Sequence, residues 1–123
     1  MHELSLARAI VAEVSQAASD RDIASVAVIE VKIGELCGVI ADSLAFAFEF
    51  VAGGTALEGA VLEFSESPVT MWCESCEAVV QPEVRLVFSC PRCQAPCPGL
   101  RSGTEIEIVR FSSASREVAE AIN

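Results

Sequence analysis

Four cysteines form two closely spaced pairs, Cys73 with Cys76 and Cys90 with Cys93. The short spacing within each pair lets both thiolates bind one ion across a tight turn, and two such pairs complete a tetrahedral shell of four sulfurs. Zn²⁺ is the ion that this ligand set favours, and iron is the alternative that also accepts four thiolates. A filled shell leaves no position for water or substrate, so the sequence predicts a structural zinc site.

The other two cysteines are not predicted to be ligands. Cys97 is close enough to the second pair to exchange with a ligand in principle, but its neighbours Pro96 and Pro98 favour an extended segment that leads away. We therefore interpret Cys97 as a spare thiol. Cys37 follows a strand that is predicted to be buried, and a small core residue is the expected role there.

The single histidine of the chain, His2, offers a second kind of metal chemistry. We expect Met1 to be retained, because the aminopeptidase that removes initiator methionine requires a small second residue. The Met1 amine, the His2 amide nitrogen and the His2 imidazole would then form adjacent chelate rings, which suit Ni²⁺ or Cu²⁺. Glu3 adds a carboxylate. A lone histidine near an N-terminus is more often simply solvated, so these residues alone indicate only a candidate weak site.

Composition restricts the class of protein. The chain has 123 residues, of which 52% are hydrophobic, enough for one modest domain with a packed core. Its 18 acidic and 8 basic residues give a net charge of −10, which disfavours nucleic acid and anionic membrane surfaces as partners. In residues 70–101 the acidic and basic side chains cancel, and a zinc tetrathiolate leaves this segment at about −2. A nucleic-acid-binding zinc ribbon is therefore not expected.

The sequence predicts a cytoplasmic protein without a membrane span. No apolar run reaches the roughly 18 residues that a span needs. Six cysteines without an export signal are typical of a protein in a reducing compartment, where paired cysteines bind metal. Charged residues interrupt the apolar stretch that a secretory signal would need: Glu3, Arg8, Glu13 and Asp20.

Hydrophobic periodicity predicts the elements that position these residues. Apolar side chains at steps of three and four predict a helix over about residues 3–19, and a β-branched stretch with alternating apolar positions predicts a strand over residues 25–36. Asp42 is the predicted N-cap of a second helix, which Gly53 ends. Strands are expected around residues 60–64 and 103–111.

These elements predict an α+β fold, in which a small sheet of about three strands is packed by two helices. A strand on each side of the cysteine segment indicates that this segment is an inserted, zinc-ribbon-like module. The expected boundaries are residues 1–69 and 102–111 for the α+β domain, 70–101 for the module and 112–123 for a C-terminal tail. The tail carries a brief helical pattern.

Four stretches in this order resemble the hydrogenase maturation nickel metallochaperones, the HypA/HybF family. They are Met1–Ser5, Lys32–Leu36, Ser43–Glu49 and the two cysteine pairs. The resemblance covers about residues 1–111. It is specific because the stretches occur together and in order, although each one alone is modest.

The resemblance implies a nickel-binding α+β domain with a structural zinc module. It implies that His2 is the main Ni²⁺ ligand, with Met1 and Glu3 contributing, and that Ni²⁺ is cargo delivered during [NiFe]-hydrogenase maturation. The implied partners are a GTPase maturation protein and the hydrogenase large subunit; some members also serve urease. The protein itself would be a monomer or homodimer.

Two departures from the family pattern are visible. Some members place an aspartate near the nickel five residues after the glutamate matching Glu35, where this chain has Ile40. The nearby Asp42 is expected to cap the second helix. Histidines that flank the cysteine pairs in some members are missing here, so a pH response would depend on His2 or on thiol protonation.

An enzyme is not expected, because the chain has no second histidine, no paired-carboxylate signature and no glycine-rich phosphate loop. The alternative to a nickel metallochaperone is a zinc-stabilised interaction adaptor with an inert N-terminus.

The nickel hypothesis also predicts a pH dependence. Protonation of the amine, the amide and the imidazole would compete with Ni²⁺, so nickel should be released on acidification.

Overall fold

A computed structural model describes residues 3–84, 86–113 and 118–120, the last three by their backbone. The helices and strands are α1 (Glu3–Asp20), β1 (Val26–Gly34), α2 (Ala41–Ala52), β2 (Val61–Ser67), β3 (Thr70–Cys73), β4 (Ala78–Val80), β5 (Leu100–Ser102), β6 (Ile106–Ser113) and β7 (Val118–Glu120). The predicted α+β class is confirmed.

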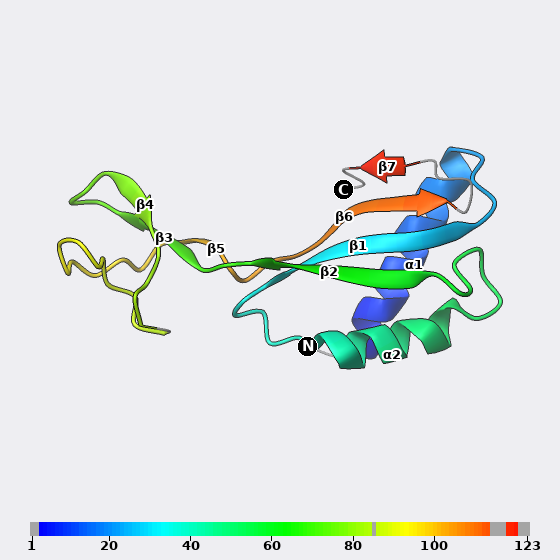
Figure 1. Cartoon of the computed structure of the whole chain (residues 1–123), viewed down its shortest axis with the longest axis horizontal. Helices are drawn as coiled ribbons and strands as arrows, with labels where there is room; N and C mark the ends of the chain where they lie inside the picture. The colour runs from blue at the N-terminus through cyan, green and yellow to red at the C-terminus, as the bar shows by residue number, and fades with distance from the viewer. Residues whose placement is uncertain (1–2, 85, 114–117, 121–123) are drawn as a thin grey trace. The chain divides into compact units, whose positions relative to one another are not determined.

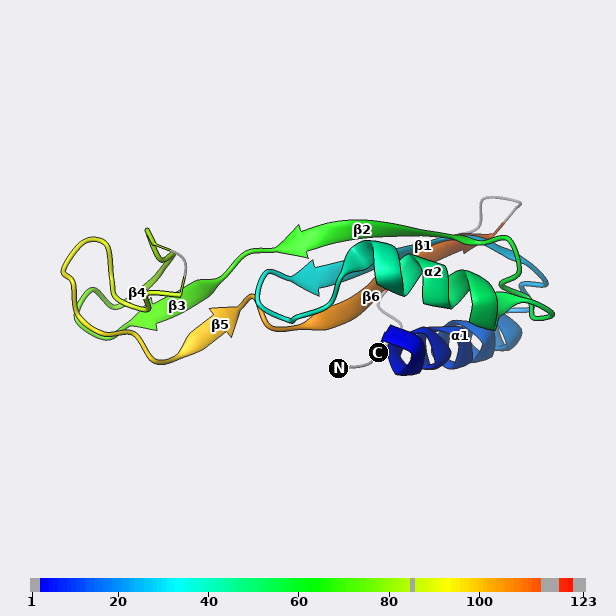
Figure 2. The same cartoon turned by 90° about the horizontal axis from the view of Figure 1, so that it is seen from below.

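A mixed sheet forms the larger layer, with strand order β2-β1-β6-β7. Strands β1 and β2 run in the same direction, as expected for two strands joined through a helix, and β6 runs against them (Figure 1). Both helices lie on one side of this sheet (Figure 2). The sheet of about three strands packed by two helices is therefore present, and β7 adds a short fourth strand at the edge next to β6.

The helices and the sheet share one core. The amphipathic pattern of α1 buries Ala7 and Val14 completely, and α2, which contacts α1, contributes Leu44 and Phe48. Ile29 of β1 is also fully buried. No helix in the described part of the chain has the length and hydropathy needed to cross a bilayer.

The start of α2 differs from the prediction. The N-cap position is Ile40, no side chain caps the helix, and Asp42 lies in the first turn. The Asp42 carboxylate in the first turn still interacts favourably with the positive end of the helix dipole. This explains why its position resembles that of a cap in the sequence. Gly53 ends the helix as expected.

The tail also differs from the helical pattern seen in the sequence. Residues 118–120 form a strand, and β7 pairs antiparallel with β6 through Arg110 with Glu120 and Ser112 with Val118. The exposed edge of β6 supplies unpaired backbone groups, and a short strand satisfies them more completely than one turn of helix would.

Contacts divide the chain into two compact units. The helical unit comprises Met1–Lys32, Gly38–Ser65 and Glu107–Asn123; the cysteine unit comprises Ile33–Cys37 and Glu66–Ile106. The cysteine unit contains a small antiparallel sheet of order β4-β3-β5. Its buried core is Val69, Met71, Cys73, Val80, Cys90 and Cys97.

Three segments of the cysteine unit pack backbone against backbone. A Cβ on Gly34 would lie 2.5 Å from the carbonyl carbon of Gly103, and a Cβ on Gly103 would lie 2.7 Å from the Cα of Val69. Gly103 also has φ of +108°, a conformation that side chains rarely adopt. Residues 33–37 can therefore lie against this part of the chain only because both positions are glycine.

Candidate metal centre

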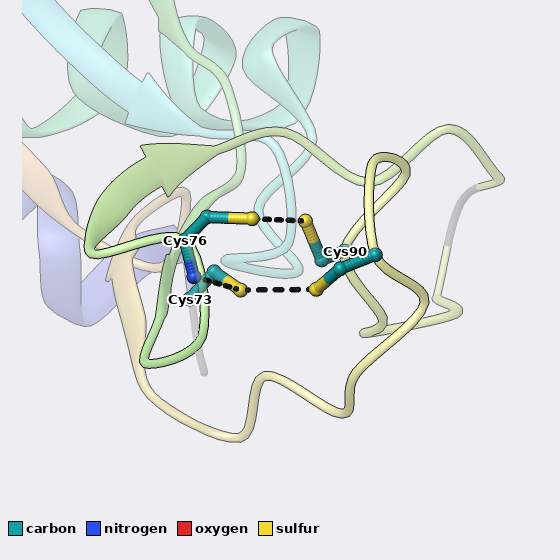
Figure 3. Close-up of side chains that lie close together, drawn as sticks. Cys73, Cys76 and Cys90 are labelled. Atoms are coloured by element: carbon teal, nitrogen blue, oxygen red, sulfur yellow. Dashed lines mark hydrogen bonds between the residues drawn. The ribbon is translucent and has the colours of Figure 1, made fainter.

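The four predicted zinc ligands come together in the cysteine unit. The Sγ atoms of Cys73, Cys76, Cys90 and Cys93 all lie within 4.8 Å of one another. Cys73 ends β3 and Cys76 lies in the turn that leads to β4, while the second pair lies in a turn of its own. In Figure 3 the side chains of Cys73, Cys76 and Cys90 converge on one centre.

The spacing of the sulfurs fits a tetrahedral zinc site. The Sγ atoms of Cys73 and Cys93 are 3.5 Å apart, and those of Cys76 and Cys90 are 3.9 Å apart. Four sulfurs at about 2.3 Å from Zn²⁺ would be separated by about 3.8 Å along each edge of the tetrahedron. The observed distances lie on either side of this value, so the four-cysteine group is consistent with zinc.

Each turn directs backbone N–H groups at the first cysteine of its pair. The amide of Cys76 donates to the Cys73 sulfur at 3.4 Å, and the amide of Arg92 donates to the Cys90 sulfur at the same distance. The Cys76 amide lowers the pKa of Cys73, and the amides of Cys93 and Arg92 lower the pKa of Cys90 to about 6. These donors stabilise thiolates before any ion arrives.

The second cysteine of the first pair has the opposite tendency. Hydrogen bonds with the sulfurs of Cys93 and Cys73 raise the pKa of Cys76 to about 12 in the metal-free chain. Thiolates this close together repel one another, which favours the protonated form of Cys76. A divalent cation would remove this repulsion, which is the electrostatic reason for the group to bind one.

The four sulfurs differ in their access to solvent. Cys73 and Cys90 are buried, Cys76 is partly buried and Cys93 is exposed. On the same small sheet, the guanidinium of Arg101 lies 4.9 Å from the ring centre of Trp72. This cation–π contact partly covers the indole of Trp72, which is itself partly buried.

Cys97 lies outside the four-sulfur group, but the prediction that its segment leads away from the second cysteine pair is wrong. It is only 1% exposed and belongs to the buried core around Cys73 and Cys90. The two prolines do impose an extended backbone, and this extended backbone pairs back, as Pro96 forms a bridge with Ser89. Cys37, expected in a core, is only partly buried.

Of the three predicted nickel ligands, the structure describes only Glu3. Met1 and His2 lie outside the described residues, and Glu3 is the partly buried first residue of α1. The chelate of Met1, His2 and Glu3 therefore stays a prediction from the sequence.

Comparison with known proteins identifies the family. Residues 1–113 match the family model described as "Hydrogenase/urease nickel incorporation, metallochaperone, hypA". A hydrogenase maturation factor HypA of Roseiflexus sp. (strain RS-1) is 44% identical over 109 residues, which are 88% of this chain and 88% of the relative. One of Streptomyces avermitilis is 40% identical over 110 residues, covering 89% and 84%.

Solved structures confirm the fold. The solution structure of the Ni metallochaperone HypA from Helicobacter pylori has a TM-score of 0.68 at 21% identity, covering 92% of this chain and 97% of that one. The solution structure of another HypA protein has a TM-score of 0.72 at 20% identity, covering 94% and 98%. From the match over residues 1–113, the chain belongs to the HypA family of hydrogenase/urease nickel-incorporation metallochaperones, a family of metal carriers and not of enzymes.

Proposed function

We propose that this protein is a nickel metallochaperone that binds Ni²⁺ through Met1, His2 and Glu3 and delivers it during [NiFe]-hydrogenase maturation. The observation that carries the proposal is the family match, which begins at residue 1 and so includes the predicted ligands. His2 is the main ligand because its amide nitrogen and imidazole, together with the Met1 amine, offer the planar nitrogen set that Ni²⁺ favours.

The chemistry of this donor set suits transfer. Three nitrogens from two consecutive residues leave a fourth planar position open, and a ligand of the acceptor protein can enter there before a nitrogen leaves. Glu3 lies in the first turn of α1, where its carboxylate offsets the positive end of the helix dipole. That offset lowers the cost of placing a cation at this end of the helix.

Cys73, Cys76, Cys90 and Cys93 are the proposed ligands of a structural Zn²⁺. Sulfur separations of 3.5 and 3.9 Å support this assignment. When bound, zinc supplies a fourfold cross-link between two turns that otherwise have little apolar core. The role is structural because four thiolates fill the tetrahedral shell.

The proposed partners are a GTPase of nickel maturation and the large subunit of a [NiFe]-hydrogenase, and the proposed compartment is the cytoplasm. The relatives, which are hydrogenase maturation factors, support a role in hydrogenase maturation. The net charge of −10 also fits a carrier of cations.

A nickel titration tests the proposal. Isothermal titration of the zinc-loaded chain should show one Ni²⁺ bound per chain, and the site should be lost in His2→Ala and in a chain extended by two residues before Met1. Both changes remove nitrogens from the chelate. A tag at the N-terminus would mask the site, so any tag belongs at the C-terminus.

Two further results separate the hypotheses. Nickel affinity should fall between pH 8 and pH 6, roughly across the ordinary pKa values of an imidazole and an α-amine, because protons compete with Ni²⁺. Equal stoichiometry and affinity in the native, His2→Ala and extended chains would instead favour a zinc-stabilised adaptor with an inert N-terminus.

A further inference from the structure

The second cysteine pair lies in a hairpin whose backbone also fixes Cys97. The amide of Cys90 donates to the carbonyl of Ala95 at 2.8 Å, and the amide of Cys97 donates to the carbonyl of Phe88 at 2.8 Å. The bridge between Ser89 and Pro96 lies between these bonds. Cys97 is therefore held at the base of the same hairpin that presents Cys90 and Cys93.

The Cys97 side chain is buried against a proposed ligand. It is 1% exposed and belongs to the same buried cluster as Cys73 and Cys90. The Cys97 thiol donates to the carbonyl of Ala95 at 3.5 Å, which is a long and weak contact. A fifth thiol thus lies beside the four-sulfur group with no strong competing interaction.

Among the four proposed ligands, Cys93 is the exposed one. Solvent-borne electrophiles and oxidants reach an exposed sulfur before a buried one. Cys93 and Cys97 also belong to one hairpin, so a change of ligand between them involves only a short stretch of chain.

We propose that Cys97 is a reserve zinc ligand, which replaces Cys93 when Cys93 is chemically modified or substituted and so keeps a four-thiolate shell. Cys73, Cys76 and Cys90 remain bound throughout. This inference rests on the proposed zinc site but not on nickel binding or delivery.

The exchange conserves protons and charge. When Cys93 leaves as a free thiol, Cys97 gives up one proton and Cys93 takes one up, and the bond to Cys97 sulfur replaces the bond to Cys93 sulfur. When an alkylating agent such as iodoacetamide caps Cys93, iodide leaves and the Cys97 proton passes to solvent. In both cases four thiolates surround the ion, and no oxidant or reductant is consumed.

The test uses full-length chains loaded with ¹¹³Cd²⁺, whose NMR shift distinguishes four sulfur ligands from three sulfurs and one oxygen. Cys93→Ser should retain a four-sulfur signal, and Cys93→Ser/Cys97→Ala should show the three-sulfur signal. Zn²⁺ affinity should be lower in the double variant than in Cys93→Ser by at least the roughly tenfold that loss of an outer-shell partner costs.

Cys93→Ser/Cys37→Ser is the matched control, because Cys37 is the remaining thiol of the cysteine unit. This control should behave as Cys93→Ser does. A three-sulfur signal in Cys93→Ser, equal to that of the double variant, would overturn the proposal. So would a changed signal in Cys97→Ala alone, since Cys97 would then be a resident ligand.

A second measurement does not depend on substituting Cys93. One equivalent of iodoacetamide is added to the native zinc-loaded chain, the modified cysteine is located by peptide mass spectrometry, and released zinc is measured with a colorimetric chelator. The native chain should retain zinc after alkylation at Cys93, whereas Cys97→Ala should release it. Equal release from both chains would contradict the proposal, and a wild-type chain without a four-sulfur signal would instead contradict the underlying zinc site.

Discussion

Ser67 and Glu105 form a short side-chain hydrogen bond in the cysteine unit. The Ser67 hydroxyl donates to Glu105 Oε2 at 2.6 Å, and the amide of Gly103 donates to Glu105 Oε1 at 2.7 Å. Both bonds favour the carboxylate, and the Ser67 hydroxyl contributes most to lowering the pKa of Glu105. Ser67 is buried, so the carboxylate also satisfies a polar group that would otherwise lack a partner.

This contact predicts a pH-dependent contribution to stability. Because the pKa of Glu105 is lowered in the folded chain, the contribution is present above the ordinary glutamate pKa of about 4.3 and is lost as pH falls past the lowered value. Ser67→Ala should raise the NMR titration midpoint of Glu105. The chain is loaded with Cd²⁺, since this softer ion holds thiolates at lower pH than Zn²⁺ does.

Ser102→Ala serves as the control for this titration. The Ser102 hydroxyl bonds to the Thr70 hydroxyl and to the carbonyl of Pro68 instead of to Glu105, so the midpoint should stay at the native value. An unchanged midpoint in Ser67→Ala would show that the backbone donors alone set the pKa of Glu105.

At the scale of one element, α2 separates its phenylalanines by face. Phe48 is 2% exposed, whereas Phe46 is 77% exposed and Phe50 is 79% exposed. Residues 46 and 50 are one helical turn apart, so both side chains project from the same face. The sequence indicates the same division, because Phe48 continues the apolar stripe of Leu44 at helical spacing while Phe46 and Phe50 lie on its flank.

This division predicts different costs for the same substitution. Phe48→Ala should destabilise the helical unit by about 3–5 kcal/mol, since it leaves a cavity in the core shared with α1. Phe46→Ala should change stability by less than about 0.5 kcal/mol, because the side chain is already in water. Urea unfolding followed by the circular dichroism of the helices measures both, and equal losses would contradict the described packing.

Element types were more predictable than element ends. The long apolar stripes of α1 and β1 determine type because they bury whole faces, and both were predicted within a residue or two. The N-terminus of α2 depends on a single backbone turn at Ile40, where no side-chain cap forms and the sequence holds no decisive signal. The burial of Cys97 depends on the pairing of Ser89 with Pro96, a contact that local propensity does not encode.

For the whole molecule, the two units depend on metal to different degrees. Three of the six buried core residues of the cysteine unit are cysteines, namely Cys73, Cys90 and Cys97, so little apolar surface remains to stabilise it without an ion. The helical unit has its own apolar core, with buried side chains from α1, α2 and β1. Metal binding is therefore expected to stabilise the cysteine unit much more than the helical unit.

Chelation of zinc should reveal this difference in the full chain. In ¹⁵N-correlated NMR spectra, the amides of β3, β4 and β5 should lose their dispersed positions, while those of α1 and α2 should keep theirs. A chain with serine at all four ligand positions should reproduce the chelated spectrum and excludes an effect of the chelator itself. Loss of dispersion in the helices to the same extent would contradict independent stability of the helical unit.

The arrangement of the four cysteines was predictable because two close pairs leave few other ways to share an ion. The segments that make up the cysteine unit around them were not predictable. Residues 33–37 belong to this unit although residues 38–65 separate them from its remaining residues in sequence. The amides of Gly34, Glu35 and Leu36 donate to the carbonyls of Glu105, Ser67 and Gly103, at 2.7, 2.9 and 2.6 Å. Glu35 Oε1 also accepts the amide of Val69 at 3.0 Å.

This segment has a consequence for protein engineering. A fragment copied from residue 66 to residue 106 would carry all four proposed zinc ligands and Cys97, but it would lose the backbone donors of residues 34–36 and the Leu36 side chain that packs on the core. The smallest graft that retains these contacts is made of two peptides, or of one peptide with a designed linker in place of residues 38–65. The cysteine motif is continuous in sequence, but the structural unit that would have to be transferred with it is discontinuous.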